Sequence, residues 1–286
     1  MRGRTRLQDE HIPYLLLIHD AKRDVIRTQL DAIEQKWVTN FDEYEAKFTA
    51  LDLATLPQPL WPNHERDALL HCYNSSTAAL SELKAEILEA QHEDVKGLCP
   101  YCCVGTTEEF DHYVPKEDFP HLAIHALNLV PCCSRCNKKK SKLWLKANQR
   151  QILHFYLDTV PTEQFLFAKV YWRNTHAGPV PTATYTLQCP DGFSSTDFAL
   201  VERHFKEMEL SLHYRKNTPR AYTDLRKVAK IARPKYSHAA IKQALMMWAE
   251  EAFVEEGFGC WRAAFALALA REVYFLDLMS TRRCIN

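Results

Sequence analysis

Glycine is scarce in this sequence, with only 7 among 286 residues. No Walker-type glycine loop is present, so any dependence on a nucleoside triphosphate has to come from another chain. Long apolar runs are also missing, because no uncharged apolar stretch reaches the ~18 residues of a membrane-spanning helix. The apolar segment FALALA lies between Arg262 and Arg271 and is too short. We therefore expect a protein that does not enter a membrane.

The N-terminal segment lacks the features of a secretory signal peptide. Its apolar core is only YLLLI, and no small-residue cleavage site follows. Ten cysteines in a chain without such a signal argue for a reducing compartment, where clustered cysteines bind metal more often than they form disulfides. We therefore expect a cytoplasmic protein in which the cysteines between residues 99 and 136 serve a metal. The remaining cysteines are expected to be small buried residues: Cys72, Cys189, Cys260 and Cys284.

Net charge is absent as well, because 36 basic residues balance 36 acidic ones. The distribution is nevertheless uneven, since no aspartate or glutamate lies between Phe119 and Leu157. This acid-free segment contains a series of basic residues: Arg135, Lys138, Lys139, Lys140, Lys142, Lys146 and Arg150. A neutral protein with one concentrated basic stripe can still bind a polyanion locally.

Helical spacing dominates the first part of the chain. Apolar residues recur at about i, i+3, i+4 and i+7 over residues 14–37, and similar patterns follow at 41–52 and 64–92. A proline-rich loop, residues 55–63, separates the last two segments. We therefore predict a helical N-terminal arm over residues 1–96, whose apolar stripes pack in the core or against a partner.

The last part of the chain combines a β-hairpin with helices. Alternating apolar and polar residues predict strands at 163–172 and 183–189, joined by a loop that contains Gly-Pro. Helical patterns follow over 197–213, 219–231, 237–256 and 258–279. Residues 260–278 are apolar on most sides, which places them in the core or in the interface of a homo-oligomer.

A second basic segment, residues 220–236, lies in this C-terminal region. Its basic side chains are Arg220, Arg226, Lys227, Lys230, Arg233 and Lys235. They either form a second phosphate-contacting surface or belong to a solvated helix face, and the sequence favours neither interpretation.

Two Cys-x-x-Cys pairs, Cys99 with Cys102 and Cys133 with Cys136, frame the segment between the arm and the hairpin. A Cys-x-x-Cys turn places two thiolates on one side of a zinc ion, and two such turns complete a tetrahedral site. Four cysteines leave no open coordination position, so we expect a structural zinc ion, Zn²⁺. Such a zinc would tie the start of the segment to its end.

Two further cysteines, Cys103 and Cys132, adjoin this frame and are alternative ligands. We favour the outer frame because both of its pairs then have two-residue spacers. A thiol redox role for Cys99 and Cys102 alone is disfavoured, because it leaves the second pair unexplained.

The residues between the two pairs depart from a plain zinc ribbon. The stretch EEFDHYVP predicts a short strand that ends at Pro115. It places Asp111 and His112 next to each other, so their side chains leave on opposite faces of the strand. Asn128 opens a second short strand, NLVPC, and Asn137 directly follows the last cysteine at the start of a lysine-rich helix.

In this order, D-H-x-x-P, N-L and C-x-x-C-N-x-x-K, framed by an earlier C-x-x-C, resemble the zinc-stabilised HNH nucleases of the His-Me finger (ββα-metal) superfamily. The resemblance covers about residues 97–146. It implies that His112 is the general base, and that Asp111 and Asn137 are ligands of one catalytic divalent ion. It implies that Asn128 bridges the finger loop and helps to orient the histidine. The structural zinc ligands that it implies are Cys99, Cys102, Cys133 and Cys136.

The chemistry of phosphodiester hydrolysis agrees with these roles. An unperturbed histidine titrates near neutral pH, as a general base requires. One carboxylate and one amide oxygen suit Mg²⁺ or Mn²⁺, because these ions keep waters and accept phosphate oxygens. We expect the lysines after Asn137 to contact the nucleic-acid backbone, with strongly salt-dependent binding. These lysines are Lys138, Lys139, Lys140 and Lys142.

Each part of this site also has a purely structural interpretation. Asp111 and His112 can form a buried hydrogen-bonded pair, and Asn137 can cap the following helix. The lysine run can be a solvated helix face. His121 and His125 match no motif position, so we interpret them as loop residues. The frame of two cysteine pairs favours the catalytic interpretation.

The expected fold is therefore α+β and mostly helical. A zinc-stabilised ββα finger, residues 97–150, is inserted between the helical arm, residues 1–96, and a hairpin-plus-helices region, residues 151–286. The favoured function is a metal-dependent HNH endonuclease that hydrolyses phosphodiester bonds, in DNA rather than RNA. The layout is similar to stand-alone bacterial nuclease effectors, including HNH subunits that Septu-type and some retron-type anti-phage systems pair with a separate ATPase.

The alternative is a zinc-bearing nucleic-acid-binding or assembly module that keeps the finger as a scaffold and does not cut. Such a scaffold could lose Asp111, His112 or Asn137 without affecting its zinc. All three are present, which favours the enzyme.

Overall fold

The fold is mixed, with many helices and, among the described residues, three small antiparallel sheets, in agreement with the predicted α+β class. The computed structural model describes residues 2–7, 11–176, 178–231 and 237–281. No helix within these ranges is long and apolar enough to cross a bilayer.

The described residues group into two compact units. The finger unit comprises residues 3–101 and 105–159, and the hairpin unit comprises the residues from 160 onward together with residue 2 and residues 102–104. The predicted arm and most of the predicted finger thus belong to one unit, and the two units are described separately below.

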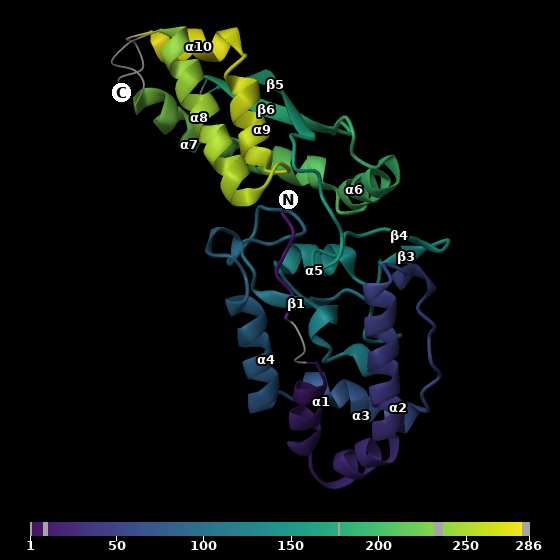
Figure 1. Cartoon of the computed structure of the whole chain (residues 1–286). Helices are drawn as coiled ribbons and strands as arrows, with labels where there is room; N and C mark the ends of the chain where they lie inside the picture. The colour runs from purple at the N-terminus through teal and green to yellow at the C-terminus, as the bar shows by residue number, and fades with distance from the viewer. Residues whose placement is uncertain (1, 8–10, 177, 232–236, 282–286) are drawn as a thin grey trace. The chain divides into compact units, whose positions relative to one another are not determined.

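Helices form the first part of the finger unit (Figure 1). They are α1 His11–Asp20, α2 Asp24–Thr49, α3 Asn63–Asn74 and α4 Ala78–Glu89, with short 3-10 helices η1 Leu53–Thr55 and η2 Glu93–Val95. The long helix α2 buries Trp37, Phe41, Tyr44 and Phe48, which recur on one face at helical spacing. The indole N–H of Trp37 donates to the carbonyl oxygen of His121 at 2.8 Å, so α2 supports the loop of the finger.

The structure corrects two predicted helix boundaries in the arm. The helix predicted over 14–37 is interrupted between α1 and α2, where the buried ammonium of Lys22 donates to two carbonyl oxygens at the end of α3. Asp24 has a φ of 52° at this break. The helix predicted over 41–52 is the end of α2, because no breaking residue follows Trp37 and its apolar face continues.

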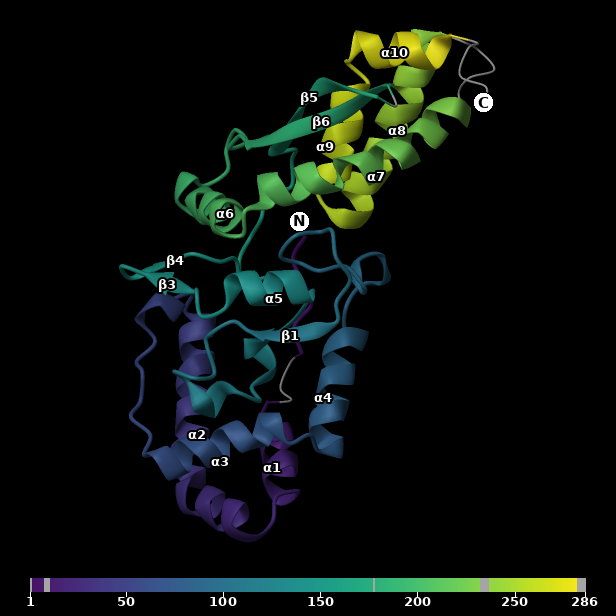
Figure 2. The same ribbon diagram turned by 180° about the vertical axis from the view of Figure 1, so that it is seen from behind.

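The finger itself is a two-stranded sheet followed by a helix. Strands β1 Glu109–His112 and β2 Leu129–Cys132 pair antiparallel, with Asp111 opposite Val130 and His112 opposite Leu129. Helix α5, Ser134–Lys140, lies beside β1 (Figures 1 and 2). The loop between the strands contains the 3-10 helices η3 Pro120–Leu122 and η4 Ala126–Asn128, and a small hairpin of β3 Leu145–Lys146 and β4 Gln149–Arg150 follows α5.

The hairpin unit contains a longer two-stranded sheet than the sequence predicts. Strands β5 Leu166–Thr175 and β6 Gly178–Leu187 pair over their full length, whereas the predicted strands stop at Trp172 and resume at Ala183. The residues between the two predicted strands include Pro179 and Pro181, which indicate a loop in the sequence. In the structure both prolines lie inside β6. A strand at the edge of a sheet tolerates proline, because the missing N–H faces away from the partner strand.

The helices of the hairpin unit are α6 Ser195–Glu207, α7 Leu210–Ile231, α8 His238–Glu256, α9 Trp261–Leu269 and α10 Val273–Ser280. Helix α7 begins well before the predicted start at Pro219, and its buried face continues across that proline. The helix predicted over 258–279 is two helices, because the chain turns after Leu269. The turn allows α9 to pack on β5 and α8, and α10 to pack on α8. Most residues of α9 are buried in the hairpin unit.

The scattered cysteines agree with the prediction only in part. Cys72 and Cys260 are buried, but Cys189 is exposed in the loop after β6, where its sulfur lies near the carbonyl oxygens of Pro190 and Phe193. Cys284, Arg233 and Lys235 lie outside the described residues.

Candidate functional site

Four buried cysteines gather at the end of the finger where the two Cys-x-x-Cys turns meet. The Sγ atoms of Cys99, Cys102, Cys133 and Cys136 all lie within 4.8 Å of one another. This cluster is the predicted outer frame. The neighbouring Cys132 lies outside it, and burial raises the pKa of its thiol, which stays protonated. The four cysteines are therefore placed to bind a metal such as zinc.

Gly105 makes this cluster sterically possible. Its carbonyl oxygen accepts a hydrogen bond from the Cys99 N–H at 2.8 Å, which closes the first turn. A Cβ atom at Gly105 would lie 2.7 Å from the Cβ and 3.0 Å from the Sγ of Cys133. Only glycine fits this close approach between the two turns. Gly105 is not among the predicted site residues, although a glycine just after a Cys-x-x-Cys turn is a recognisable sign of such an approach.

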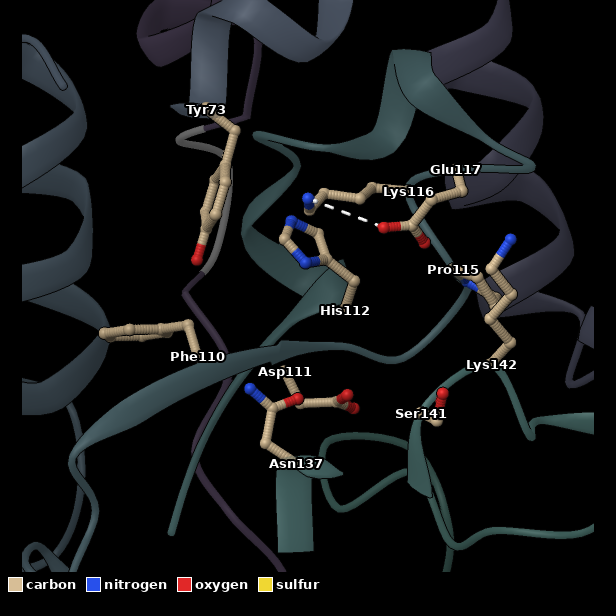
Figure 3. Close-up of a pocket in the computed structure, with 10 residues that line it drawn as sticks. All are labelled: Tyr73, Phe110, Asp111, His112, Pro115, Lys116, Glu117, Asn137, Ser141 and Lys142. Atoms are coloured by element: carbon tan, nitrogen blue, oxygen red, sulfur yellow. Dashed lines mark ion pairs between the residues drawn. The ribbon is translucent and has the colours of Figure 1, made fainter. Parts of the chain in front are cut away.

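A pocket of about 370 Å³ lies where β1, the loop after it and α5 meet (Figure 3). It brings together four of the predicted site residues, namely Asp111, His112, Asn137 and Lys142. The other lining residues are Tyr73, Phe110, Pro115, Lys116, Glu117 and Ser141. Figure 3 shows Asp111 next to Asn137, with His112 nearby and the two aromatic rings on one side. The predicted residues Asn128, Lys138, Lys139 and Lys140 do not line it.

The imidazole of His112 is held in one orientation. Its Nε2 lies 2.9 Å from the carbonyl oxygen of Ala123, and its ring meets the ring of Tyr73 edge-on with centroids 4.4 Å apart. Because a carbonyl only accepts hydrogen bonds, Nε2 carries the proton and Nδ1 keeps its lone pair. Burial lowers the pKa of His112 to about 3, and the ammonium groups of nearby lysines act in the same direction. The ring is therefore neutral near pH 7 with the Nδ1 lone pair available, but at this lowered pKa His112 is a weaker base than the unperturbed histidine expected from the sequence.

Asp111 forms a buried ion pair. Its carboxylate lies 2.9 Å from the ammonium of Lys140, and it also accepts a hydrogen bond from the hydroxyl of Tyr101 at 2.7 Å. The Lys140 ammonium donates to the carbonyl oxygen of His112 at 2.8 Å as well. Asp111 and Lys140 are both almost fully buried. Lys140 thus points into the finger, whereas contact with a nucleic-acid backbone needs an accessible ammonium.

Asn137 faces the pocket from the middle of α5. Its Nδ2 donates to the carboxylate of Glu109 at 2.6 Å, which leaves its Oδ1 as the available acceptor. Because α5 begins at Ser134, Asn137 does not cap this helix, so that structural alternative is wrong. Glu109 lies two residues before Asp111 on β1 and therefore on the same face of the strand. Glu109 is not among the predicted site residues, although the alternation along the strand already placed it on the same face as Asp111.

Asn128 is fully buried at the base of the finger loop. Its Oδ1 accepts from the N–H of Val114 at 2.7 Å, and its Nδ2 donates to the carbonyl oxygens of Val114 and Leu122 at 3.0 Å each. These bonds join the two ends of the loop. Ala123, which accepts from His112, is the next residue after Leu122, so Asn128 fixes the loop that holds the histidine.

The other predicted lysines differ in their relation to the pocket. Lys138 and Lys139 are exposed on α5 and do not line it, whereas the exposed Lys142 lines it and lies 3.7 Å from Asp118. His121 and His125 are buried in the finger loop and do not line the pocket. His121 accepts at Nδ1 from the indole N–H of Trp61, and His125 lies 3.4 Å from Glu45.

The largest omission of the sequence analysis is the contribution of the arm. Tyr73 on α3 lines the pocket, and Lys84 on α4 lies next to the Tyr73 ring. Nothing in their local sequence marks these two residues, because only the packing of α3 and α4 against the finger brings them to the site.

Known proteins give partial matches to this chain. Protein ea31 of Escherichia phage lambda is 28% identical over 155 residues, which are 51% of this chain and 50% of ea31. Septu protein PtuB of Bacillus thuringiensis is 40% identical over 47 residues, which are 15% of this chain and 18% of PtuB. The chain thus spans about half the length of one relative and less than a fifth of the other. No protein-family model and no solved structure matches.

Proposed function

We propose that this protein is a metal-dependent endonuclease of the HNH type, which hydrolyses phosphodiester bonds in DNA. The observation that carries the proposal is one pocket that gathers a neutral histidine, a carboxylate and an amide oxygen on a ββα finger. The cysteine cluster at the end of the finger adds support, since a metal bound there would give this small element a framework.

His112 would act as the general base. Its Nδ1 accepts a proton from water while the water oxygen bonds to phosphorus and the bond to the 3′-oxygen breaks. The leaving 3′-oxygen takes its proton from solvent. The Ala123 carbonyl keeps the proton of the neutral ring on the other nitrogen, so Nδ1 is the atom whose lone pair takes the proton from water. Asn128 contributes indirectly, by holding the loop that carries Ala123.

The donors in the pocket fit a hard divalent cation. Asp111 and Asn137 offer a carboxylate and an amide oxygen, which Mg²⁺ and Mn²⁺ prefer over nitrogen or sulfur. When bound, such an ion supplies positive charge that stabilises the phosphate and the leaving oxygen. Glu109 orients the Asn137 amide so that its oxygen faces the pocket. The Asp111 carboxylate also serves Lys140, so we expect weak metal binding in the absence of the substrate phosphate.

Zinc is the metal that we propose for the cysteine cluster. Four cysteine sulfurs form a closed donor set, so this ion would hold the ends of the finger together and take no part in hydrolysis. The exposed Lys138, Lys139 and Lys142 would contact the DNA backbone beside the pocket. Lys140 is left out of this set because it is buried against Asp111.

A role in defence against phages is a further part of the proposal. Its support is the partial match to a Septu protein, together with the layout of the finger between helical segments. In that role the protein would act in the cytoplasm, with a separate ATPase as its partner.

The proposal is tested by plasmid cleavage with the purified full-length protein in Mg²⁺, Mn²⁺ or EDTA. We expect nicked or linear DNA with either metal and none with EDTA. His112→Ala is expected to lower the rate at least ~100-fold, because a general base contributes roughly that much or more. The zinc content of both proteins is measured first, so that a loss of activity reports on His112 and not on the cysteine cluster.

Two results would contradict the proposal. Equal cleavage by the wild type and zinc-replete His112→Ala would remove His112 from the mechanism. Tight DNA binding without cleavage in any metal would instead favour the non-catalytic scaffold.

A further inference from the structure

Lys116 and Lys142 line the pocket, while Lys140 and Lys84 each lie next to residues that line it, and these four lysines differ in their partners. Three are paired with carboxylates: Lys140 with Asp111 at 2.9 Å, Lys116 with Glu117 at 3.6 Å, and Lys142 with Asp118 at 3.7 Å. The fourth, Lys84, has no carboxylate or other acceptor among the residues that the structure describes. A cation without a partner at the wall of a polar pocket is suited to bind an external anion.

The position of Lys84 is nevertheless well defined. Its ammonium lies 4.1 Å from the centre of the Tyr73 ring and 5.7 Å from the centre of the Phe110 ring, and both rings line the pocket. A cation over an aromatic face is attracted by the electrons of the ring, which keeps the ammonium there without neutralising its charge. Lys84 is half-buried, and this burial lowers its pKa.

The packing of helix α4 fixes the position of Lys84. Helix α4 buries Leu80, Leu83 and Ile87, and Lys84 lies at the edge of that apolar face. Its methylene stem is therefore part of the packed surface, while its charged end reaches the aromatic wall of the pocket. A group fixed in this way loses little conformational freedom when it binds an anion.

Tyr73 connects this ammonium to the proposed base. One face of its ring carries Lys84, and the ring meets His112 edge-on at 4.4 Å. The Tyr73 hydroxyl has no hydrogen-bond partner among the described residues. Burial raises its pKa to about 12, so the hydroxyl is a donor at neutral pH. The Tyr73 ring, which Figure 3 shows on one side of the pocket, thus carries a donor hydroxyl and lies against the unpaired ammonium of Lys84.

We infer that Lys84 and Tyr73, both from the helical arm, form an anion subsite that binds a backbone phosphate of the DNA strand in the pocket. The inference rests on the proposed function for the identity of the anion. It assigns the arm a direct part in substrate binding, since α3 and α4 each supply one group of the subsite. Lys84 would carry the charge of the contact, and Tyr73 would place the ammonium and donate one hydrogen bond.

The subsite is tested by DNA binding, which does not depend on cleavage. The full-length protein carries His112→Gln to prevent turnover, and its affinity for a short fluorescein-labelled DNA duplex is measured by anisotropy from ~50 to ~200 mM KCl. Lys84→Met removes the charge but keeps the stem, and we expect the slope of log affinity against log salt to fall by about 1. Lys84→Arg is expected to restore most of the slope. Tyr73→Phe is expected to lower the affinity and to leave the salt slope unchanged.

Lys36→Met is the matched control. Lys36 also rests over an aromatic ring, at 3.8 Å from the centre of Trp61, but it is paired with Glu65 and lies away from the pocket. We expect this variant to bind like the parent protein. Should Lys84→Met fail to fold by circular dichroism, Lys84→Gln supplies the same comparison.

An unchanged slope and affinity in Lys84→Met would overturn the subsite. An equal loss of affinity and slope in Lys36→Met would also overturn it, because that result would indicate a general effect of charge. Neither result would affect the proposed hydrolysis. Conversely, a wild-type protein that fails to cut DNA would contradict the proposed function, while the binding series would still decide the subsite.

Discussion

The carboxylate of Asp111 has two roles, one in the fold and one in the proposed function. It balances the buried ammonium of Lys140, and in the proposed function it also binds the catalytic metal. A carboxylate oxygen can accept more than one interaction, so both are compatible. The pair therefore contributes to the fold of the finger as well as to its chemistry, and its removal should affect stability even without metal or DNA.

Lys140→Met provides the residue-scale prediction. The substitution leaves the Asp111 carboxylate buried without its cation, and we expect the free energy of unfolding to fall by about 3–5 kcal/mol. Urea unfolding at pH 7 measures the change. Lys138→Met is the control, because Lys138 is exposed on the same helix and its replacement should change stability by no more than about 0.5 kcal/mol. Equal losses in the two variants would contradict the structural role of Lys140.

At the scale of elements, the finger depends on a close approach between two turns. Strands β1 and β2 pair over only four residues each, and α5 is seven residues long. Elements this short gain little stability by themselves. The cysteine cluster joins the turn before β1 to the start of α5, which explains why its geometry matters to the pocket between them.

Gly105→Ala is the prediction at this scale. The added methyl group would lie 2.7 Å from the Cβ atom of Cys133, so the two turns have to separate. We expect a lower zinc content and a melting temperature reduced by several degrees, consistent with a loss of about 1–3 kcal/mol. Gly97→Ala is the matched control, since nothing lies within 4 Å of a Cβ atom at Gly97. Full zinc content in Gly105→Ala would contradict the steric argument.

At the scale of the whole molecule, buried histidines couple stability to pH. His154 is fully buried among aromatic rings, and burial, with the charge of Arg150 nearby, lowers its pKa from 6.5 to about 3. The unfolded chain takes up a proton at this histidine near pH 6.5, whereas the folded protein takes it up only near pH 3. The free energy of unfolding therefore decreases as the pH falls below about 6.5.

Urea unfolding at a series of pH values tests this coupling. Each such histidine should contribute a slope of about 1.4 kcal/mol per pH unit between those two pKa values. His121 has a pKa lowered to about 3 by the same cause and adds to the effect. His154→Leu should reduce the slope by the contribution of one group. A stability that stays constant from pH 7 to pH 5 would contradict the prediction.

Local patterns were sufficient for much of the architecture. Helical spacing located the buried face of α2, alternation located β1, and the two Cys-x-x-Cys pairs located the cysteine cluster, because the signal of each helix, strand or cysteine pair is local in the sequence. Element ends were less well predicted. The prolines in β6 and the proline inside α7 are local signals for a break, but packing outweighs both.

The sequence by itself determined the class of the fold, the cysteine frame and four of the residues that line the pocket, namely Asp111, His112, Asn137 and Lys142. The tertiary structure alone decided how those residues are partnered. It buried Lys140 against Asp111, oriented Asn137 through Glu109, and brought Tyr73 and Lys84 from the arm to the pocket. The physical reason is range: spacing along a chain fixes which face a residue occupies, whereas contacts between distant segments depend on how whole elements pack.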